Sequence, residues 1–516
     1  LSLRRQRQMC IRDRDGKSIC TTSTLTFSAD EAGRYFILIS ATNAGGTTEK
    51  EIRIDVFQLD VPTISIADAD KGFKVLQGSE LTITPIVDSF LETSYSWQIN
   101  GEDISNELTC TLPTIELGEY QVRFATHNED GDDEVTFKVE VCSPDQVDFN
   151  WTFLQTEYNM SAGRTIRIKP VDVNNALDAV YTWTVDNEQV QSGENDTYLF
   201  TSEQQGEHTV KVEMKNSYIL ATQTLKVNVC PPAGTYQRKI SATSSASMNK
   251  VYEYLPAPGQ FINENHNTTT MAEACTYAEE RINQTAYVSL GGFGGYIIVG
   301  FDHSIVNDGD YNIAITGNAF DGSSEPGIVW VMQDENGDGL PNDTWYELRG
   351  SEYGKAETWQ DYAVTYHKPT GIQLPTPWTD NHGQSGSIDY LGAFHRQDYY
   401  YPAWVKEKQY TLRGTRLKER NYDQSGNGTY WVNDSYEWGY ADNFSAIDRL
   451  TDDDNYNAGP SDNHFKISHA VTFDGKDANL KYVDFIKVQV GVNSKSGWLG
   501  EISTEVFGIK DFNMLK

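Results

Sequence analysis

Cysteine and long apolar runs are scarce in this sequence, and each shortage excludes a class of protein. The six cysteines show no Cys-x-x-Cys or other metal-binding spacing, so we expect no structural zinc site and no dense disulfide framework. Cys142 and Cys230 occupy matching repeat positions and are not expected to pair, and we predict one disulfide at most. No run of about 18 apolar residues occurs, so no transmembrane helix is predicted.

Basic residues are also few. The 41 Lys and Arg stand against 74 Asp and Glu, giving a formal net charge of −33. Because phosphate binding needs a basic face, we expect no nucleic-acid partner. The acidic surplus favours solubility and divalent cations, although a solvated surface explains it equally well.

Aromatic residues, by contrast, are abundant. The chain has 29 Tyr and 11 Trp in 516 residues, and 12% of its residues are aromatic. This composition suits β-sandwiches with aromatic-lined surfaces better than helical bundles. The length predicts three or four domains.

The first 15 residues differ from the rest of the chain. Leu1 to Arg14 contains no apolar signal-peptide core, and Met9-Cys-Ile-Arg-Asp resembles the translation of a sequencing adapter. We therefore interpret residues 1–15 as non-native, adapter-derived sequence and leave them out of fold reasoning. The native N-terminus, with any export signal or lipid-anchor cysteine, is then expected to lie outside this sequence.

A repeat organises the N-terminal part. The strand patterns that begin at Gly33, Gly118 and Gly206 are 85 and 88 residues apart, and Trp97 and Trp183 are 86 residues apart. A fixed period with alternating strands and one core Trp predicts tandem immunoglobulin-like sandwiches. The predicted domains are a partial one at 16–58, complete ones at 59–143 and 144–231, and a larger C-terminal one at 235–516.

The Gly-x-Tyr-x-Val…Asn pattern of these repeats resembles the PKD-like domains of surface proteins from the Bacteroides group. The resemblance covers roughly residues 20–231. Pro231-Pro-Ala-Gly234 follows as a proline-stiffened linker.

The C-terminal part is predicted to be a jelly-roll-like β-sandwich, so the whole chain is all-β. Tyr287 to Phe301 reads as two buried strands joined by a glycine-rich bend, with further strands at short intervals up to about residue 509. A single helix is predicted over Thr270 to Ile282, where Thr270 and Glu273 form a capping box.

Side-chain oxygens recur at alternate positions from Asp334 to Asp343, with a glycine where a cation-binding loop turns. Ca²⁺ takes six to eight oxygen ligands, and one loop with this spacing supplies many of them. The predicted ligands are Asp334, Asn336, Asp338, the carbonyl of Leu340, Asn342 and Asp343, with Glu347 as an alternative closing ligand. An acidic hairpin turn without metal explains the pattern equally well. A second acidic run, Asp448 to Asn457, is predicted to be a solvated loop.

Aromatic and polar residues gather between Tyr390 and Phe444, and this segment is the predicted ligand-binding region. Rigid rings with a polar tip suit sugars or flat rings, and nearby polar groups orient them. Because strands bury alternate residues, we expect about half of these rings in the core. The candidate ligand-binding residues are Tyr399, Tyr400, Trp404, Tyr430, Trp431, Tyr436, Trp438, Tyr440, Arg396 and Asp442.

Signals for catalysis are weak. The histidines are scattered without HExxH spacing, and acidic pairs such as Glu437 with Asp442 are expected by chance in so acidic a chain. We therefore expect no enzyme. Two alternatives remain: a carbohydrate-active enzyme (glycoside hydrolase or lyase) with two carboxylates in a cleft, and a surface adhesin with no concave aromatic site.

Residues 235–512 also resemble PKD-like surface lipoproteins of gut Bacteroidetes, through Leu290 to Phe301, Ser324 to Trp330, Asp334 to Leu348 and Trp498 to Glu505. The resemblance implies a lipid-anchored accessory protein on the outer-membrane surface, beside a TonB-dependent uptake receptor and linked in some members to corrinoids. We accordingly expect a non-catalytic protein that captures a small-molecule or glycan ligand, with Ca²⁺ in the 334–343 loop.

Overall fold

The computed structural model describes residues 8–12, 18–29, 33–56, 59–89, 91–143, 149–174, 176, 178–216, 219–264, 266–450 and 460–516. These residues form an almost entirely β protein, as the sequence predicts. They divide into two compact units, one of residues 1–65, 87–107 and 122–136 and the other of residues 66–86, 108–121 and 137–516. Among the described residues, no helix is both long and apolar enough to cross a bilayer.

The N-terminal sheet has the strand order β2-β1-β3-β4. Its strands are β1 (Gln8–Arg12), β2 (Ser18–Cys20), β3 (Gly33–Asn43) and β4 (Gly46–Val56). β3 and β4 form a long antiparallel hairpin. Strand β1 lies within residues 1–15, which we interpret as non-native sequence, and it pairs antiparallel with β3.

The strands of residues 59–143 include the one that carries the predicted core tryptophan. They are β5 (Thr63–Ser65), β6 (Phe73–Leu76), β7 (Leu81–Ile83), β8 (Ile86–Asp88), β9 (Ser94–Ile99), β10 (Glu102–Ser105), β11 (Cys110–Leu112), β12 (Gly118–Asn128) and β13 (Gly131–Cys142). Trp97 on β9 is fully buried and its ring centroid lies 4.6 Å from that of Phe124 on β12. The indole N–H of Trp97 donates to the Glu107 carbonyl at 2.9 Å.

Residues 144–231 repeat this plan around Trp183. The strands are β14 (Glu157–Ser161), β15 (Thr165–Ile168), β16 (Val180–Val185), β17 (Glu188–Gly193), β18 (Tyr198–Thr201), β19 (Gly206–Lys215) and β20 (Leu220–Cys230). They form a five-stranded sheet, β14-β20-β19-β16-β17, and a second pair, β15-β18. Alternate residues of β19 and β20 are buried, as expected for strands with one face on a core. Cys142 and Cys230 are both free, as are Cys20 and Cys275.

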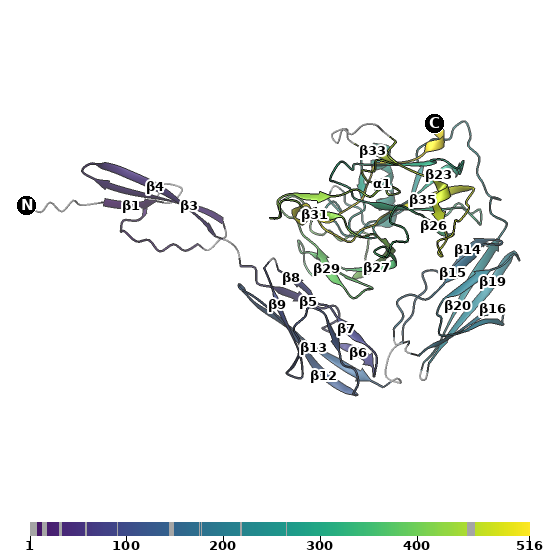
Figure 1. The fold of residues 1–516 in the computed structure, drawn as a ribbon, viewed down its shortest axis with the longest axis horizontal. Helices are drawn as coiled ribbons and strands as arrows, with labels where there is room; N and C mark the ends of the chain where they lie inside the picture. Colours follow the sequence, from purple (N-terminus) through teal and green to yellow (C-terminus); the bar gives the residue numbers. More distant parts are fainter. Residues whose placement is uncertain are drawn as a thin grey trace, which may run out of the picture. The chain divides into compact units, whose positions relative to one another are not determined.

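The C-terminal module holds the remaining strands and the one α-helix of the described residues (Figure 1). Its sheets have the orders β21-β23-β35-β25-β26-β34, β29-β28-β27-β30 and β33-β24-β37. The elements are β21 (Lys250–Leu255), α1 (Met271–Asn283), β22 (Val288–Ser289), β23 (Tyr296–Val306), β24 (Ile313–Gly317), β25 (Gly327–Met332), β26 (Trp345–Leu348), β27 (Trp359–His367), β28 (Thr376–Asp380), β29 (Ser385–Ile388), β30 (Gln409–Arg416), β31 (Asn421–Asp423), β32 (Trp431–Asn433), β33 (Ser461–Phe465), β34 (Ala470–Val471), β35 (Tyr482–Val490), β36 (Glu505–Val506) and β37 (Gly508–Asp511), with short 3₁₀ turns η2 (Ile467–His469), η3 (Gly497–Leu499) and η4 (Phe512–Met514).

The glycine-rich bend between β22 and β23 is confirmed, and its geometry explains its composition. A Cβ on Gly295 would lie 1.8 Å from the Leu290 carbonyl oxygen, and one on Gly291 would lie 2.1 Å from the Ala257 carbonyl oxygen. The backbones therefore pass closer than any side chain allows. This bend places β23 beside β35 in the middle of the largest sheet.

Helix α1 begins as predicted. Thr270 is its N-cap, and the capping box with Glu273 is formed: the Glu273 amide donates to the Thr270 hydroxyl, and the Glu273 carboxylate accepts from the Thr270 amide. The helix buries Ala274, Ala278 and Ile282 and packs against β21.

Candidate functional site

The structure buries four rings of the predicted ligand-binding set, together with the neighbouring Tyr401. Tyr400, Tyr401, Trp404, Tyr436 and Tyr440 are each at most 6% exposed. Each also has a backbone partner: for example, the Tyr436 hydroxyl donates to the Lys418 carbonyl at 2.6 Å, and the Trp404 indole N–H donates to that of Tyr254 at 3.1 Å. All five rings fill the core with their polar tips satisfied, so Tyr400, Trp404, Tyr436 and Tyr440 do not belong to a ligand-binding surface.

The other candidates differ in their exposure. Tyr399 is half-buried against the core, Tyr430 is 59% exposed, and Arg396 is exposed. The Trp431 ring lies against Gly497, where a Cβ would come within 2.3 Å of its indole nitrogen. The rings of residues 395–440 therefore do not form a single shared hollow in the structure.

One candidate ring, Trp438, lines a pocket of about 240 Å³. The pocket combines aromatic, apolar and charged side chains from β26, β33, η2 and the segment 438–448. Its lining residues are Tyr311, Leu348, Arg349, Trp438, Gly439, Ile447, Asp448, His464, Phe465, Lys466 and His469. The half-buried Trp438 ring lies 5.2 Å from the His469 ring, centroid to centroid, at an interplanar angle of 59°.

Two cations reach this pocket. The Arg349 guanidinium pairs with Asp477 at 2.8 Å, and the Lys466 ammonium lies 4.6 Å from the centroid of the Tyr311 ring and 3.7 Å from Asp310. All five of these side chains are at least partly exposed. The cations therefore remain accessible to a ligand that carries negative charge or hydrogen-bond acceptors.

The titratable groups of the pocket have shifted pKa values. Burial lowers the pKa of both His464 and His469, which favours neutral imidazoles at pH 7. Burial raises the pKa of Asp448, a carboxyl only 2% exposed that accepts from the Gly439 amide at 2.6 Å and the Asn463 side chain at 2.9 Å. The prediction of a solvated loop is therefore wrong at Asp448, because this residue is buried and lines the pocket. Residues 451–459 of the same acidic run lie outside the described residues.

A larger hollow of about 590 Å³ lies on β9, β12 and β13. Most of its lining residues are polar or charged, and its aromatic residues are Tyr95 and His127. A ligand on such an open sheet face would stay largely exposed to water, so the Trp438 pocket is the better candidate site.

The predicted calcium loop is tightly hydrogen-bonded within itself. Asp334 accepts from the amides of Gly337 at 2.7 Å and Gly339 at 3.0 Å, and Asp338 accepts from the side chains of Asn336 and Asn342 at 2.8 and 2.9 Å. The Leu340 amide donates to Asp338, and Asp343 accepts from the Glu335 amide. Burial raises the pKa of Asp343 to about 8, and its Oδ1 atom has no hydrogen-bond partner in the described part of the chain.

Asp442, the last predicted ligand-binding residue, is 1% exposed and belongs to a different group. Among the described residues, one set of three or more His, Cys, Asp or Glu side chains brings its ligand atoms within 4.8 Å of one another: Glu325, Asp442 and Glu505. Sequence reasoning missed Glu325 and Glu505 as site residues because the three lie far apart in the chain.

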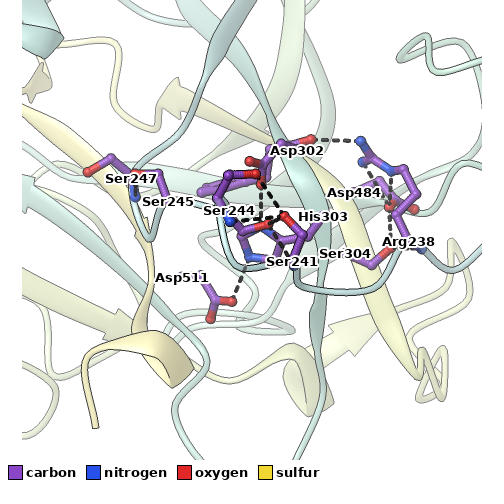
Figure 2. Close-up of polar contacts among 12 residues, drawn as sticks. Arg238, Ser241, Ser244, Ser245, Ser247, Asp302, His303, Ser304, Asp484 and Asp511 are labelled. Carbon is purple, nitrogen blue, oxygen red and sulfur yellow. Dashed lines mark hydrogen bonds and ion pairs between the residues drawn. The ribbon is translucent and has the colours of Figure 1, made fainter.

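A buried polar network surrounds His303, whose ring is fully buried (Figure 2). Its Nδ1 lies 2.6 Å from Asp302 and its Nε2 lies 2.9 Å from Asp511. Nearby, Asp484 accepts from Arg238 at 3.0 Å and from the Ser304 hydroxyl at 2.6 Å. Both ring nitrogens of His303 are committed to carboxylates, so neither is free to act as a base toward a serine.

Comparisons with known proteins find one family match and several similar solved structures. A family model described as a PKD-like domain matches residues 61–128 and 133–216. Similar solved structures include the fibronectin(III)-like modules of Clostridium thermocellum CbhA (15% identity, 35% of this chain and 100% of that one, TM-score 0.18). Others are the three N-terminal domains of the bacteriophage RB49 outer capsid protein Hoc (14% identity, 43% and 88%, TM-score 0.21) and the Ig1-2 module of the Drosophila receptor tyrosine phosphatase DLAR (12% identity, 33% and 97%, TM-score 0.17). No curated protein matches the chain.

Proposed function

We propose that this chain is a non-catalytic ligand-capture protein for nutrient uptake, in which tandem Ig/PKD-like sandwiches present a C-terminal binding module. The observation that carries the proposal is the Trp438 pocket, where an accessible indole lies beside two accessible cations. The ligand class is a glycan or a corrinoid, since both offer a ring face and polar groups to a site of this kind.

The acidic content of the pocket favours binding over hydrolysis. Glycoside hydrolysis uses two carboxyl groups on either side of the scissile bond. The pocket lining contains one acidic residue, Asp448, and its two oxygens accept hydrogen bonds from Gly439 and Asn463. The pair Glu437 and Asp442 offers no substitute, because Glu437 is exposed and Asp442 is buried.

Replacing Trp438 with Ala tests the ligand site. Titration of the full chain with a panel of glycans and corrinoids, followed by calorimetry, is expected to find a binder whose affinity falls at least about tenfold in W438A, or about 1.4 kcal/mol. Trp498→Ala is the matched control, because Trp498 is 49% exposed and lies outside the pocket. Equal affinity in W438A and the native protein, or no binding by any member of the panel, contradicts the proposal.

Replacing Lys466 with Gln separates the two parts of the site. We expect K466Q to weaken binding of anionic ligands while neutral ones keep their affinity, because the substitution removes charge and leaves the Trp438 ring in place. The same loss for both classes would mean that Lys466 acts through the pocket structure.

Calcium in the 334–343 loop is the second part of the proposal. The loop hydrogen bonds bring Asp334 and Asp338 into an ordered turn, and the unpartnered Oδ1 atom of buried Asp343 fits an oxygen ligand for a hard cation. The thermal midpoint of the chain is expected to rise with Ca²⁺ and fall with EDTA. An identical midpoint in both conditions removes calcium from the proposal.

The cellular setting rests on the resemblance alone. We propose the outer-membrane surface, through a lipid anchor outside this sequence, with a TonB-dependent receptor as partner. Proteinase K treatment of intact cells should cleave the chain, and full protection of the chain in intact cells would contradict that location.

A further inference from the structure

Three acidic side chains from distant parts of the C-terminal module meet in its interior. Glu325 precedes β25, Asp442 follows the residue that bridges to Gly327, and Glu505 begins β36. Their carboxylate oxygens all lie within 4.8 Å of one another. Asp442 is 1% exposed, Glu505 is 4% exposed, and Glu325 is half-buried.

The backbone around Asp442 is shaped to hold its carboxylate. Its Oδ1 accepts from the amides of Asn318 at 2.8 Å and Ala319 at 2.9 Å, and its Oδ2 accepts from the Glu505 amide at 2.9 Å. Gly317 leaves the necessary space, since a Cβ there would lie 2.5 Å from Oδ1. Burial and the nearby Glu325 carboxyl raise the pKa of Asp442, and these three N–H donors partly offset that rise.

The other two carboxyl groups lack such support. Glu325 accepts one long hydrogen bond, 3.4 Å from the Ser503 amide, and the Oε1 atom of Glu505 has no hydrogen-bond partner among the described residues. The groups that act most strongly on the three carboxyls are other carboxyls, backbone amides and a serine hydroxyl, with no cationic side chain among them. Buried carboxylates normally pair with a cation or bind a metal.

We propose that Glu325, Asp442 and Glu505 bind one Ca²⁺ ion. An all-oxygen ligand set selects a hard cation, and oxygens that lie within 4.8 Å of one another are close enough to bind one Ca²⁺ ion at its usual Ca–O distance of about 2.3–2.6 Å. Mg²⁺ requires a smaller, regular octahedron and keeps several waters, which suits a buried cluster less well. The unpartnered Glu505 oxygen becomes a ligand, and the ion offsets the like charges.

The site joins the start of β25, the segment that carries Asp442 and the start of β36. These segments already share backbone hydrogen bonds: the Glu325 amide donates to the Asp442 carbonyl and the Gly327 amide to that of Ala441, each at 2.9 Å. An ion here cross-links them through their side chains as well. Its role is structural, and it is separate from the 334–343 loop.

The test counts Ca²⁺ ions per chain. The full-length protein is stripped with chelator, dialysed against Ca²⁺ and measured by elemental mass spectrometry, alongside Glu505→Gln and Glu325→Gln. We expect each substitution to lower the bound calcium by one ion per chain. Glu437→Gln is the matched control, because Glu437 is exposed on the segment that carries Asp442 and should leave the count unchanged.

A loop variant keeps the test decisive even if the Gln variants fail to fold. Asp338→Asn alters the 334–343 loop and leaves the three carboxylates untouched, so one Ca²⁺ should remain bound, and Tb³⁺ should report it through sensitised emission. No Ca²⁺ bound to D338N, or an unchanged count in folded E505Q, overturns the proposal. The second result would indicate that Glu325 and Glu505 share a proton instead.

Discussion

Replacing Glu347 with Gln should change how the stability of the C-terminal module depends on pH. Glu347 lies on β26 and is 5% exposed, and its carboxyl group accepts a hydrogen bond from the Thr415 hydroxyl. Burial raises the pKa of Glu347 from 4.5 to about 7. The folded protein therefore binds a proton here more tightly than the unfolded chain does, and this contribution is lost as pH rises from 4.5 through 7.

The difference between these pKa values corresponds to about 3 kcal/mol. The native protein should lose that amount of stability between about pH 4.5 and pH 8, whereas the glutamine side chain of E347Q has no proton to release and keeps an acceptor for Thr415. For a module of roughly 280 residues, about 3 kcal/mol corresponds to a shift of about 5 °C in Tm. E347Q should therefore melt close to the native protein at pH 5 and about 5 °C above it at pH 8.

Differential scanning calorimetry of the full chain at pH 5, 6, 7 and 8 measures this difference, in whichever transition the substitution moves. Comparing the two proteins at each pH cancels the titration of the other buried acids. Glu407→Gln, at an exposed position, should shift no transition at any pH. A Tm difference between E347Q and the native protein that is the same at pH 5 and pH 8 would refute the reasoning, because it would mean that Glu347 is ionised throughout.

Two substitutions test the packing. Gly295→Ala should prevent the C-terminal module from folding, because the new Cβ would overlap the Leu290 carbonyl. Its control is Gly309→Ala, where nothing lies within 4 Å of the new Cβ and the positive φ should cost about 1 kcal/mol of stability. Near-UV circular dichroism distinguishes the two variants, and a native spectrum for G295A would contradict the clash. Trp97→Ala should destabilise its sandwich by about 3–5 kcal/mol through the lost burial and indole hydrogen bond, measured by urea unfolding, and a loss below about 1 kcal/mol would place Trp97 outside the core.

The local features of the fold were predictable from the sequence. Gly295 and its neighbours marked a close backbone approach, Thr270 and Glu273 marked the start of α1, and the period between Trp97 and Trp183 marked the repeat. Each of these signals depends on residues close in sequence or on a fixed repeat length. Strand β21 was missed because its residues, Lys250–Leu255, alternate too weakly beside the Ser- and Asn-rich stretch around them.

The candidate site was only partly predictable. The predicted aromatic segment contains Trp438, which lines the pocket, but the cations Arg349 and Lys466 come from distant elements and carry no local signature. Composition also could not separate Tyr436 and Tyr440 from Trp438, because irregular segments have no fixed alternation and a tyrosine hydroxyl is readily satisfied by a buried carbonyl or amide. The cluster of Glu325, Asp442 and Glu505 could not be predicted either, because its three residues lie far apart in the sequence.

The segment from Tyr436 to Tyr440 has a mechanical consequence. Two inward tyrosines, 2% exposed and 5.4 Å apart between ring centroids, clamp the chain on either side of Trp438. The backbone that carries Trp438 cannot move away without pulling one of these tyrosines out of the core. For the ligand proposed above, we therefore expect a binding surface that is ordered before the ligand arrives, so that little conformational entropy is lost on binding.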